Sequence, residues 1–488
     1  MSVVMRLWTS IAIGFAVALG MGAAQAPPSD PPQPNPALPL PNAPWQPHVR
    51  LVYESDTRAY YRPCGCNANS AGGLARRAAL LKDLRAQSAP VVVCTAGDFY
   101  GTADIFNEAK SRFVARMMDQ LGYDAIGVGE MDLNFGLATL VADVRSLGLP
   151  VVCANLRAKT DSLRIRGEGP AAAAADRLGS AFPPYRVVST AGSRFGFVGL
   201  ISPATKVKPA AQKDEPVEAI TYSLDDPVAV AKSVIPELRA ACDVLVVLAH
   251  MGEEEAVALV AAVPGIDLVV LGHDPAGRPL GQPRTAGGAR ILRATSQGQN
   301  IGELNVKLGD DHRLADAFNR IHIMDASHRD DPEMAKRVEG FDEENRKLQK
   351  ELFARQQLQG DEQDPFGGRY LGVGACQSCH VEEFDVYAHT RHARAYATLA
   401  SQFVHRDTNC VGCHVTGYGE AGGFQGVRVR GADVDLIDVQ CEACHGPGAD
   451  HARDGSYRDT AIASCVKCHT PNDDPDFDFA TDWPKIAH

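Results

Sequence analysis

Short apolar runs alternate with longer amphipathic stretches over residues 49–325 of this chain. The apolar runs are rich in valine, isoleucine and leucine and end at polar or turn-forming residues, which is the pattern of buried β-strands. They predict strands at Val49–Tyr53, Val91–Cys94, Ala125–Val128, Val151–Ala154, Phe195–Ile201, Val244–Ala249 and Leu268–Leu271. The stretches between several of them predict helices at Leu74–Ala86, Asn107–Leu121 and Asp226–Ala241. This alternation predicts a layered α/β domain whose strands are buried on both faces.

The pattern changes on either side of this region. Residues 331–357 are charged and helix-prone, with Glu and Lys spaced as on a solvated helix, and Gly360–Gly368 breaks that helix. Within the α/β region, Ala171–Ala175 predicts a surface loop or a short helix. From residue 369 the chain becomes rich in cysteine and histidine and is too short to be stabilised easily by its own side chains.

The N-terminal residues have the pattern of a secretory signal. Arg6 supplies a positive charge, an apolar run covers residues 7–21, and small residues follow at 22–24. We expect cleavage after Ala24, with an uncleaved anchor as the alternative, and export to the periplasm or beyond. No later apolar run is long enough to span a membrane. The predicted organisation is a signal peptide at 1–26, a proline-rich linker at 27–48, an α/β domain at 49–325, a helical linker at 326–368 and a final domain at 369–488.

Composition narrows the classes of partner. The chain is 45% hydrophobic and 22% charged, which is typical of globular proteins, and its formal net charge is −12. A negative chain is a poor ligand for nucleic acid or for an anionic membrane surface. The charge suits a basic or neutral redox partner, either periplasmic or associated with the membrane.

The pattern Cys-x-x-Cys-His occurs four times in the last domain. The copies are Cys376-Gln-Ser-Cys379-His380, Cys410-Val-Gly-Cys413-His414, Cys441-Glu-Ala-Cys444-His445 and Cys465-Val-Lys-Cys468-His469. This spacing is that of covalent c-type haem attachment, in which the two thiols bind the porphyrin and the imidazole binds the iron. A zinc ribbon or a set of disulfides is the alternative, but zinc does not require a histidine after every second cysteine. We therefore expect four covalently bound haems.

Further histidines are candidates for the second iron ligand of each haem. They are His392, His451 and His488, with His405 and His389 as weaker candidates. A haem with an imidazole on each face is low-spin and suited to electron transfer. A haem without a second ligand would be open to a small molecule. A contact with a haem propionate, or a surface position, is the alternative for each of these histidines.

Donor residues for a metal follow the strands of the α/β domain. Asp56, Asp98, Glu130, His250 and His273 each lie at or just past the carboxyl end of a predicted strand or its short continuation, where open α/β sheets place their ligands. Carboxylate and imidazole groups in one place suit Zn, Mn or Fe. Any one of the five alone would be an ordinary polar residue at a strand end. Together they predict a metal site.

The order of these residues resembles the N-terminal domain of the 5′-nucleotidase family of calcineurin-like metallophosphoesterases. The matching stretches are Leu-Val-Tyr-Glu-Ser-Asp56, Gly72-Gly-Leu-Ala-Arg-Arg77, Ala96-Gly-Asp98, Gly129-Glu-Met-Asp132, Ala154-Asn-Leu, Phe197-Val-Gly-Leu-Ile-Ser-Pro203, His250-Met-Gly and Gly272-His273. In that family two metal ions share a bridging aspartate and activate a hydroxide that attacks phosphorus. The resemblance implies that Asp98 is the bridge.

The departures from the family pattern change what the resemblance implies. Arg58 stands where the family has a ligand histidine, and Pro275 stands where it has a histidine or glutamine. Glu130 replaces an asparagine ligand, and Met131 replaces a histidine that the family uses in catalysis. We therefore expect one divalent metal, with two as the alternative. Arg58 could place its fixed positive charge where the missing metal would lie.

A cysteine pair lies in the loop after Asp56. Pro63-Cys64-Gly65-Cys66 resembles a divergent branch of this superfamily in which one of the cysteines can be a selenocysteine, which implies a reactive or metal-bound sulfur. Three interpretations stay open: Cys64 and Cys66 bind the metal, cycle between dithiol and disulfide, or form an inert bridge.

The last domain resembles the tetrahaem cytochrome c-554 family. The matching stretches are Thr390-Arg-His392-Ala-Arg-Ala, Gly417-Tyr-Gly-Glu-Ala-Gly-Gly-Phe424, Cys441-Glu-Ala-Cys-His-Gly-Pro-Gly448 and Phe477-Asp-Phe-Ala-Thr-Asp-Trp-Pro-Lys-Ile-Ala-His488. The expected fold class is therefore a layered α/β metallophosphoesterase-like domain followed by a small, mostly α multihaem domain with little sheet.

These observations lead to three functional hypotheses. The first is electron transfer through the haems, coupled to a metal or cysteine site in the α/β domain. The second is a metal-dependent phosphoester hydrolase with a haem module for docking or regulation. The third is a reductase that acts on a small molecule at a five-coordinate haem. The candidate catalytic residues in the α/β domain are Asp98, Arg58, Cys64 and Cys66.

Overall fold

The structure is a computed structural model. It describes residues 46–64, 70–102, 105–190, 192–205, 221–273, 282–359, 370–401, 408–418, 420, 422–424, 436–455, 462–470, 473–474 and 476–488. The predicted signal peptide, most of the proline-rich linker, the break at Gly360–Gly368, and the site candidates Cys66 and His405 lie outside the described residues.

The first of two large sheets has five strands in the order β15-β14-β1-β4-β5. The strands are β1 (Val49–Glu54), β4 (Val91–Thr95), β5 (Ala125–Ile126), β14 (Asn300–Leu308) and β15 (Leu314–Ile323). β1 and β4 run parallel, as do β4 and β5, whereas β14 pairs antiparallel with both β1 and β15. Every residue of β1 is buried, as expected for a strand covered on both faces.

The second large sheet has six strands in the order β12-β13-β11-β10-β8-β7. The strands are β7 (Tyr185–Thr190), β8 (Ser193–Ile201), β10 (Val244–His250), β11 (Leu268–Gly272), β12 (Arg284–Ala286) and β13 (Ala289–Arg293). β8, β10, β11 and β13 are parallel to one another, and the two outer strands are antiparallel. The buried, valine-rich β10 lies in the middle of this sheet.

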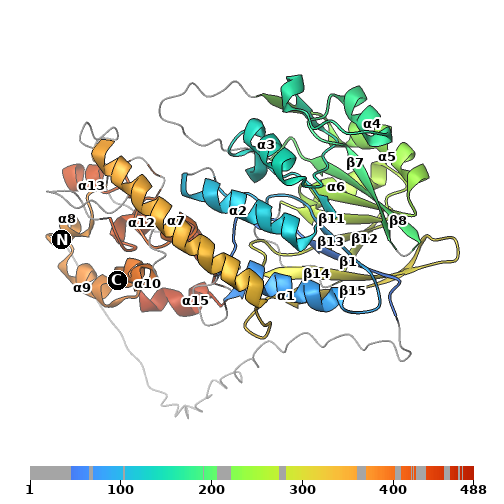
Figure 1. The fold of residues 1–488 in the computed structure, drawn as a ribbon. Helices are drawn as coiled ribbons and strands as arrows, with labels where there is room; N and C mark the ends of the chain where they lie inside the picture. The colour runs from blue at the N-terminus through green and yellow to red at the C-terminus, as the bar shows by residue number, and fades with distance from the viewer. Residues whose placement is uncertain are drawn as a thin grey trace, which may run out of the picture. The chain divides into compact units, whose positions relative to one another are not determined.

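The two sheets face each other across an apolar core. That core joins Leu51, Tyr53 and Val92 of the first sheet to Phe197 and Val246 of the second. Figure 1 shows helices on the outer sides of the sheets, and two further apolar clusters form there. The first sheet is covered by α1 (Leu74–Arg85), α2 (Ile105–Leu121), α3 (Leu137–Leu147) and the first part of α7 (Pro332–Gln359); the second by α4 (Pro170–Leu178), α5 (Pro227–Ala241) and α6 (Glu253–Ala262). The result is a four-layered α/β/β/α arrangement, which confirms the predicted layered α/β fold.

Short elements connect the layers. They are the strand pairs β2 (Pro63–Cys64) with β3 (Ala71–Gly72) and β6 (Leu156–Ala158) with β9 (Tyr222–Leu224), and the 3-10 turns η1 (Met131–Leu133) and η2 (Asp161–Leu163). The three predicted helices are confirmed, and the alanine run forms α4. Asp226 caps α5 by accepting a hydrogen bond from the backbone N–H of Ala229 at 2.7 Å.

The predicted strand at Val151–Ala154 is wrong. Val151 makes an isolated bridge to Ile126, and the chain then passes from one sheet to the other. Val152 N donates to the carbonyl of Ile126 in the first sheet at 2.8 Å, whereas Ala154 N donates to the carbonyl of Gly199 in the second sheet at 2.8 Å. This segment is apolar because it is buried, but it makes only brief hydrogen-bonded contact with each sheet.

Helix α7 confirms the helix expected over residues 331–357, but its first part is not a solvated spacer. Phe341 stacks on Phe113 of α2 with ring centroids 4.1 Å apart, and Asp342 accepts a hydrogen bond from Tyr61 at 2.8 Å. Met334 and Phe341 are buried in the apolar cluster on the outer side of the first sheet. Met334, Val338 and Phe341 recur at helical spacing and form the packed face of this part of the helix.

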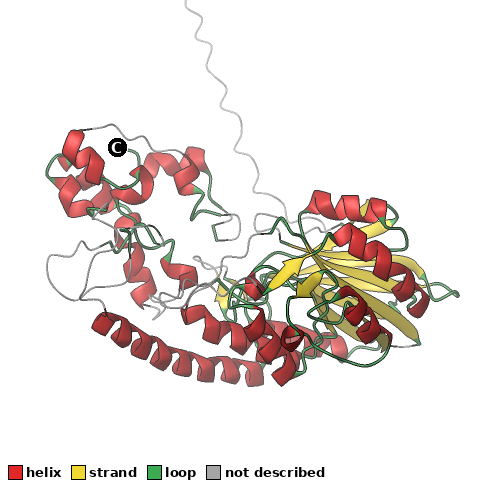
Figure 2. Cartoon of the chain, turned by 90° about the horizontal axis from the view of Figure 1, so that it is seen from above, coloured by secondary structure: helices red, strands yellow, loops and turns green. Residues whose placement is uncertain are grey.

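The described residues between 370 and 488 form short helices joined by loops (Figure 2). The helices are α8 (Val373–Gln377), α9 (Val381–His389), α10 (Ala395–Ser401), α11 (Thr408–Val411), α12 (Cys441–His445), α13 (Ala449–Asp454), α14 (Ile462–Cys465) and α15 (Phe479–Asp482), with 3-10 turns η3 (His392–Arg394) and η4 (Trp483–Lys485). Extended pairing among the described residues of this region is limited to one bridge, between Val415 and Ile437. The small, mostly α character of the region is confirmed.

Among the described residues, no helix combines the length and the apolar character needed to cross a membrane.

Candidate metal centre and haem-binding sites

The five donor residues that follow the strands lie at one edge of the α/β domain. Asp56 follows β1 and Asp98 follows β4, and these two strands are parallel neighbours. His250 ends β10 and His273 follows β11, which are parallel neighbours in the other sheet. Because parallel strands end at the same edge, the sheets bring all four residues together, and Glu130 joins them from the turn before η1.

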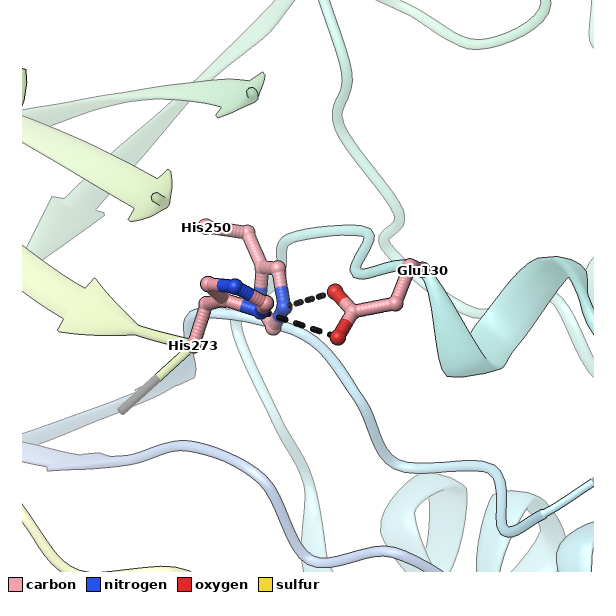
Figure 3. A group of neighbouring side chains, drawn as sticks. All are labelled: Glu130, His250 and His273. Atoms are coloured by element: carbon pink, nitrogen blue, oxygen red, sulfur yellow. Dashed lines mark hydrogen bonds and ion pairs between the residues drawn. The ribbon is translucent and has the colours of Figure 1, made fainter. Parts of the chain in front are cut away.

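Glu130, His250 and His273 form the first cluster (Figure 3). The Nε2 atom of His250 lies 2.6 Å from one oxygen of Glu130, and the Nδ1 atom of His273 lies 2.9 Å from the other. His250 Nδ1 donates to the carbonyl of Ala96 at 3.0 Å, which fixes the ring and directs Nε2 into the site. Two imidazoles and a carboxylate, one ring oriented by a backbone carbonyl, are a common metal-binding set.

Asp56 and Asp98 form a second cluster with His250. The Oδ2 atom of Asp98 lies 3.5 Å from His250 Nε2, and it is a buried oxygen without a hydrogen-bond partner in the described part of the chain. Its other oxygen accepts from the backbone N–H of Met131 at 2.8 Å. An unsatisfied buried carboxylate oxygen beside an imidazole fits a metal ligand, because a bound cation would supply the missing partner.

Electrostatics couple these groups tightly. Burial raises the pKa of Asp98, and the neighbouring carboxylates Glu130 and Asp56 raise it further, against the opposing effect of His250. Burial would also raise the pKa of Glu130, but hydrogen bonds from His250 and His273 lower it well below its usual range. Burial would lower the pKa of His250, yet Asp98 and Glu130 raise it to about 10. Without a metal, a proton on His250 therefore balances the carboxylates that face it.

The turns that carry these residues have unusual backbone conformations. Asp56, Arg58, Asp98 and His273 all have positive φ, between 52° and 62°. Such strained positions persist only where the surroundings hold them, and they gather at functional sites. Gly129 allows the close approach, because a Cβ there would lie 2.1 Å from Asp98 Oδ1.

Asp132 organises the site, a role that the motif alone did not reveal. Its carboxylate accepts backbone hydrogen bonds from Asp98 and Gly129 at 2.8 Å each and from Tyr100 at 2.9 Å. It thereby ties the turn after β4 to the turn after β5. In the sequence the only sign of this role is an aspartate two residues after Glu130. The structure shows that this aspartate is buried and anchors the turn.

Arg58 and Cys64 occupy different surroundings. Arg58 Nη2 lies 3.3 Å from Asp56 Oδ1, so the guanidinium reaches the second cluster. Cys64 ends β2 and is half-buried, and neither cluster of metal ligands found among the described residues contains it. Its partner Cys66 is outside the described residues, so the three interpretations of the pair stay predictions.

In the C-terminal region, three of the motif histidines each face a histidine from elsewhere in the chain. The ring centroids of His380 and His451 are 5.8 Å apart, those of His445 and His488 are 5.9 Å apart, and those of His469 and His392 are 6.1 Å apart. A metal–imidazole bond of about 2 Å on each side of one iron places two ring centres roughly 6 Å apart. The spacing therefore fits an iron ion between each pair.

The hydrogen bonds of these histidines suit metal ligation. His469 Nδ1 lies 2.6 Å from Asp474 Oδ2, and His488 Nδ1 donates to the carbonyl of Ile486 at 3.1 Å. Engaging Nδ1 leaves Nε2 for a metal. Burial, together with the adjacent His469, lowers the pKa of His392, which favours the neutral form that an iron ligand needs.

His414 differs from the other motif histidines. Its Nδ1 donates to the carbonyl of Ala395 at 2.6 Å, but no other described ring faces it. His405 is outside the described residues, and His389 points its Nδ1 back to the carbonyl of Asp385 at 2.7 Å. The predicted second ligands His392, His451 and His488 are thus each opposite a motif histidine.

The motif cysteines also approach one another in two places. The thiol of Cys376 is within hydrogen-bonding reach of that of Cys441, and the thiol of Cys413 is within reach of that of Cys468. The first and third motifs are therefore neighbours, as are the second and fourth. Neither metal-ligand cluster among the described residues contains a motif cysteine.

Comparisons with known proteins match the N-terminal and the C-terminal parts of the chain to different proteins. A family model described as cytochrome c554 and c-prime matches residues 375–446. Cytochrome c-554 of Nitrosomonas europaea is 33% identical over 111 residues, which are 19% of this chain and 44% of that protein. The snake venom 5′-nucleotidase of Naja atra is 25% identical over 278 residues, which are 54% of this chain and 49% of that protein.

A solved structure supports the fold of the N-terminal part. The 5′-nucleotidase precursor of Thermus thermophilus has a TM-score of 0.50 at 24% identity, covering 60% of this chain and 58% of that chain. This chain spans about half the length of the curated relatives that it matches. The molecule therefore joins two classes of domain, a calcineurin-like phosphoesterase fold and a multihaem cytochrome fold. More specifically, its N-terminal part is homologous to 5′-nucleotidases and its C-terminal part to cytochrome c-554.

The donor sets fit the groups that these relationships imply. Covalent haem is implied by the cytochrome relationship, and the facing imidazoles fit it. A divalent metal is implied by the phosphoesterase fold, and either Glu130, His250 and His273 or Asp56, Asp98 and His250 would hold it. When bound, such a metal acts as a Lewis acid and lowers the pKa of a bound water.

Proposed function

We propose that this protein is an exported electron-transfer protein whose four covalently attached haems carry electrons, while its α/β domain holds a divalent metal. The observation that supports electron transfer most strongly is the set of three imidazole pairs with ring centroids 5.8–6.1 Å apart. In each pair a histidine of a haem motif faces a histidine that belongs to no motif.

An iron bound by two imidazoles has no free position for a substrate. Such a haem is low-spin and changes its geometry little between the ferric and ferrous states, which favours electron exchange. The contacts of Cys376 with Cys441 and of Cys413 with Cys468 support two close haem pairs. Close haems exchange electrons rapidly, so the region would transfer electrons from one haem to the next.

Export is supported by the chain and its relatives. The predicted signal peptide and the c-type motifs agree, because haem is attached to such motifs outside the cytoplasm. The relatives include a snake venom protein. We infer a periplasmic location in a bacterial cell and a basic or neutral redox protein as the partner, since the chain carries a net charge of −12.

The test is spectroscopic and uses the full-length protein. Haem content per chain should be four, dithionite should reduce all haems, and an oxidant should restore the ferric state. Electron paramagnetic resonance should show low-spin ferric signals for the three haems with two imidazoles. A protein that carries its haems but cannot be reduced and reoxidised would contradict the proposal.

A second candidate function is the reduction of a small molecule at the haem of the second motif. The observation that favours it is that no described ring faces His414. A five-coordinate haem would give a high-spin ferric signal and would change its spectrum with nitrite, hydroxylamine or nitric oxide. A wholly low-spin spectrum that none of these ligands alters would count against this function.

A third candidate is hydrolysis of a phosphoester at the metal site. The clusters around His250 favour it, but Arg58 and Met131 stand where the family has a ligand and a catalytic histidine. Turnover of simple phosphodiesters or nucleotides with a divalent metal, abolished by Asp98→Ala, would establish it. No turnover with Mn, Zn, Co or Fe would exclude it.

A further inference from the structure

The inference concerns Arg58, the residue that replaces a metal-binding histidine at the edge of the α/β domain. Its Nη2 atom lies 3.3 Å from Asp56 Oδ1, and the side chain is only 18% exposed. Burial alone would lower the pKa of Arg58, but Asp56, Asp98 and Glu130 all act to raise it. The guanidinium therefore contacts Asp56, a member of the second cluster, and its charge is favoured by Asp98 and Glu130.

The backbone holds this arginine in place. The N–H groups of Asp56, Arg58 and Ala59 donate to the carbonyls of Gly97, Asp98 and Phe99 at 2.9, 2.8 and 3.1 Å. All three donor residues have positive φ. The turn is thus tied, residue by residue, to the turn that carries Asp98, and this fixes the backbone of Arg58 beside the site.

The charges of the site set how many metals it accepts. Ligands bind metals in their deprotonated forms, so Asp56, Asp98 and Glu130 contribute three negative charges and the two histidines none. Asp132 lies behind the site and is satisfied by three backbone N–H groups. With Arg58 supplying one positive charge, a single divalent ion brings the buried site to neutrality. A second ion would leave two uncompensated positive charges next to a fixed cation.

We propose that the site is mononuclear: one divalent metal is held by Glu130, His250 and His273, and the Arg58 guanidinium occupies the second cation position, in the cluster of Asp56 and Asp98. Two departures from the family thus compensate each other, because Glu130 adds a negative charge and Arg58 a positive one. A site of this kind is neutral, whereas a dimetal site between two carboxylates is positively charged. It should therefore bind dianionic phosphoesters poorly. The inference does not depend on the proposed electron transfer.

The experiment counts metals in full-length haem-loaded protein. Haem iron, measured as the pyridine complex, counts the chains in each sample. The protein is stripped with a chelator, incubated with excess Mn, Zn or Co, desalted, and analysed for the added element. We expect one added metal per chain for the wild type and for Arg58→Lys, which keeps the charge. We expect two for Arg58→His, because an imidazole there would complete a second site with Asp56 and Asp98; histidine also tolerates positive φ better than most residues.

Each outcome decides the matter. Two metals in the wild type, or one metal in a well-folded Arg58→His variant, would overturn the proposal. If Arg58→His folds poorly by circular dichroism, the wild-type count together with Glu130→Gln decides. That variant should bind its single metal at least about tenfold more weakly if Glu130 is a ligand. Reducibility of the haems, recorded on the same samples, shows separately whether the electron-transfer proposal holds.

Discussion

The two parts of the chain are stabilised in different ways. In the α/β part, apolar side chains fill three clusters, and strands such as β1 and β10 are buried along their whole length. In residues 370–488 the described apolar core is a small cluster around Tyr370, Val411 and Phe424.

The two parts differ in what fills their cores. Each fully buried aliphatic side chain contributes about 1.5–3 kcal/mol, so the α/β part can be stable through its own residues. The described residues of the C-terminal part form only one small apolar cluster, and bound porphyrins would add apolar surface to it.

The largest expected effect comes from removing a haem. Replacing Cys441 and Cys444 with serine should abolish attachment at the third motif and expose residues 370–488 to trypsin, while residues 46–348 stay resistant. Mass spectrometry and limited proteolysis measure both effects. Cys242→Ala is the control, because this buried cysteine is outside the motifs and should leave four haems in place. A C-terminal region that stays resistant without that haem would break the comparison.

A cavity in the α/β core should cost less but affect only that part. Leu248 lies in β10 between the sheets and is fully buried, so Leu248→Ala should lower the free energy of unfolding of the α/β part by about 2–5 kcal/mol. Urea unfolding followed by circular dichroism measures this change. The haem absorbance should keep its wild-type spectrum in native buffer. A loss of less than about 1 kcal/mol would mean that the sheets are not held by this core.

Removal of a second iron ligand should change one haem without unfolding the region. His451→Ala should convert the haem of the first motif from low-spin to high-spin, because His380 would lose the imidazole that faces it. Electron paramagnetic resonance should show one new high-spin signal. His389→Ala is the matched control, since His389 is exposed and bonded to the carbonyl of Asp385. If both variants keep the wild-type spectrum, the pairing of His380 with His451 is incorrect.

The smallest expected effect is the acid sensitivity of a charge cluster on the first sheet. Burial would raise the pKa of Glu303, but the hydrogen bond to His322 at 2.7 Å lowers it below its usual value. A lowered pKa means that ionised Glu303 stabilises the fold above its unfolded pKa, and this contribution is lost as pH falls through the folded pKa. Glu303→Gln should therefore cost about 1 kcal/mol at pH 7 and less at pH 3. Equal destabilisation at both pH values would show that the charge has no part in it.

Much of the site could be predicted because its signals are local. A haem motif lies within five consecutive residues, so its chemistry does not depend on the rest of the chain. The strand-end donors Asp56, Asp98 and His250 were also predictable, because a buried apolar run defines where a strand ends. The same reasoning failed at Val151–Ala154, where burial reflects a crossing between sheets rather than a strand.

The sequence by itself therefore determined the two kinds of domain, and it predicted the residues that would attach haem and those that would bind a metal. Only the tertiary structure decided which histidines face each other, that α7 packs on α2, and that Asp132 anchors the turns of the site. It also placed the Arg58 guanidinium beside the Asp56 carboxylate. The physical reason is distance along the chain. His380 and His451 are far apart in the sequence, and the spacing of neighbouring residues does not predict that they meet. Contacts of that kind depend on how all the elements pack, whereas a haem motif is defined by five adjacent residues.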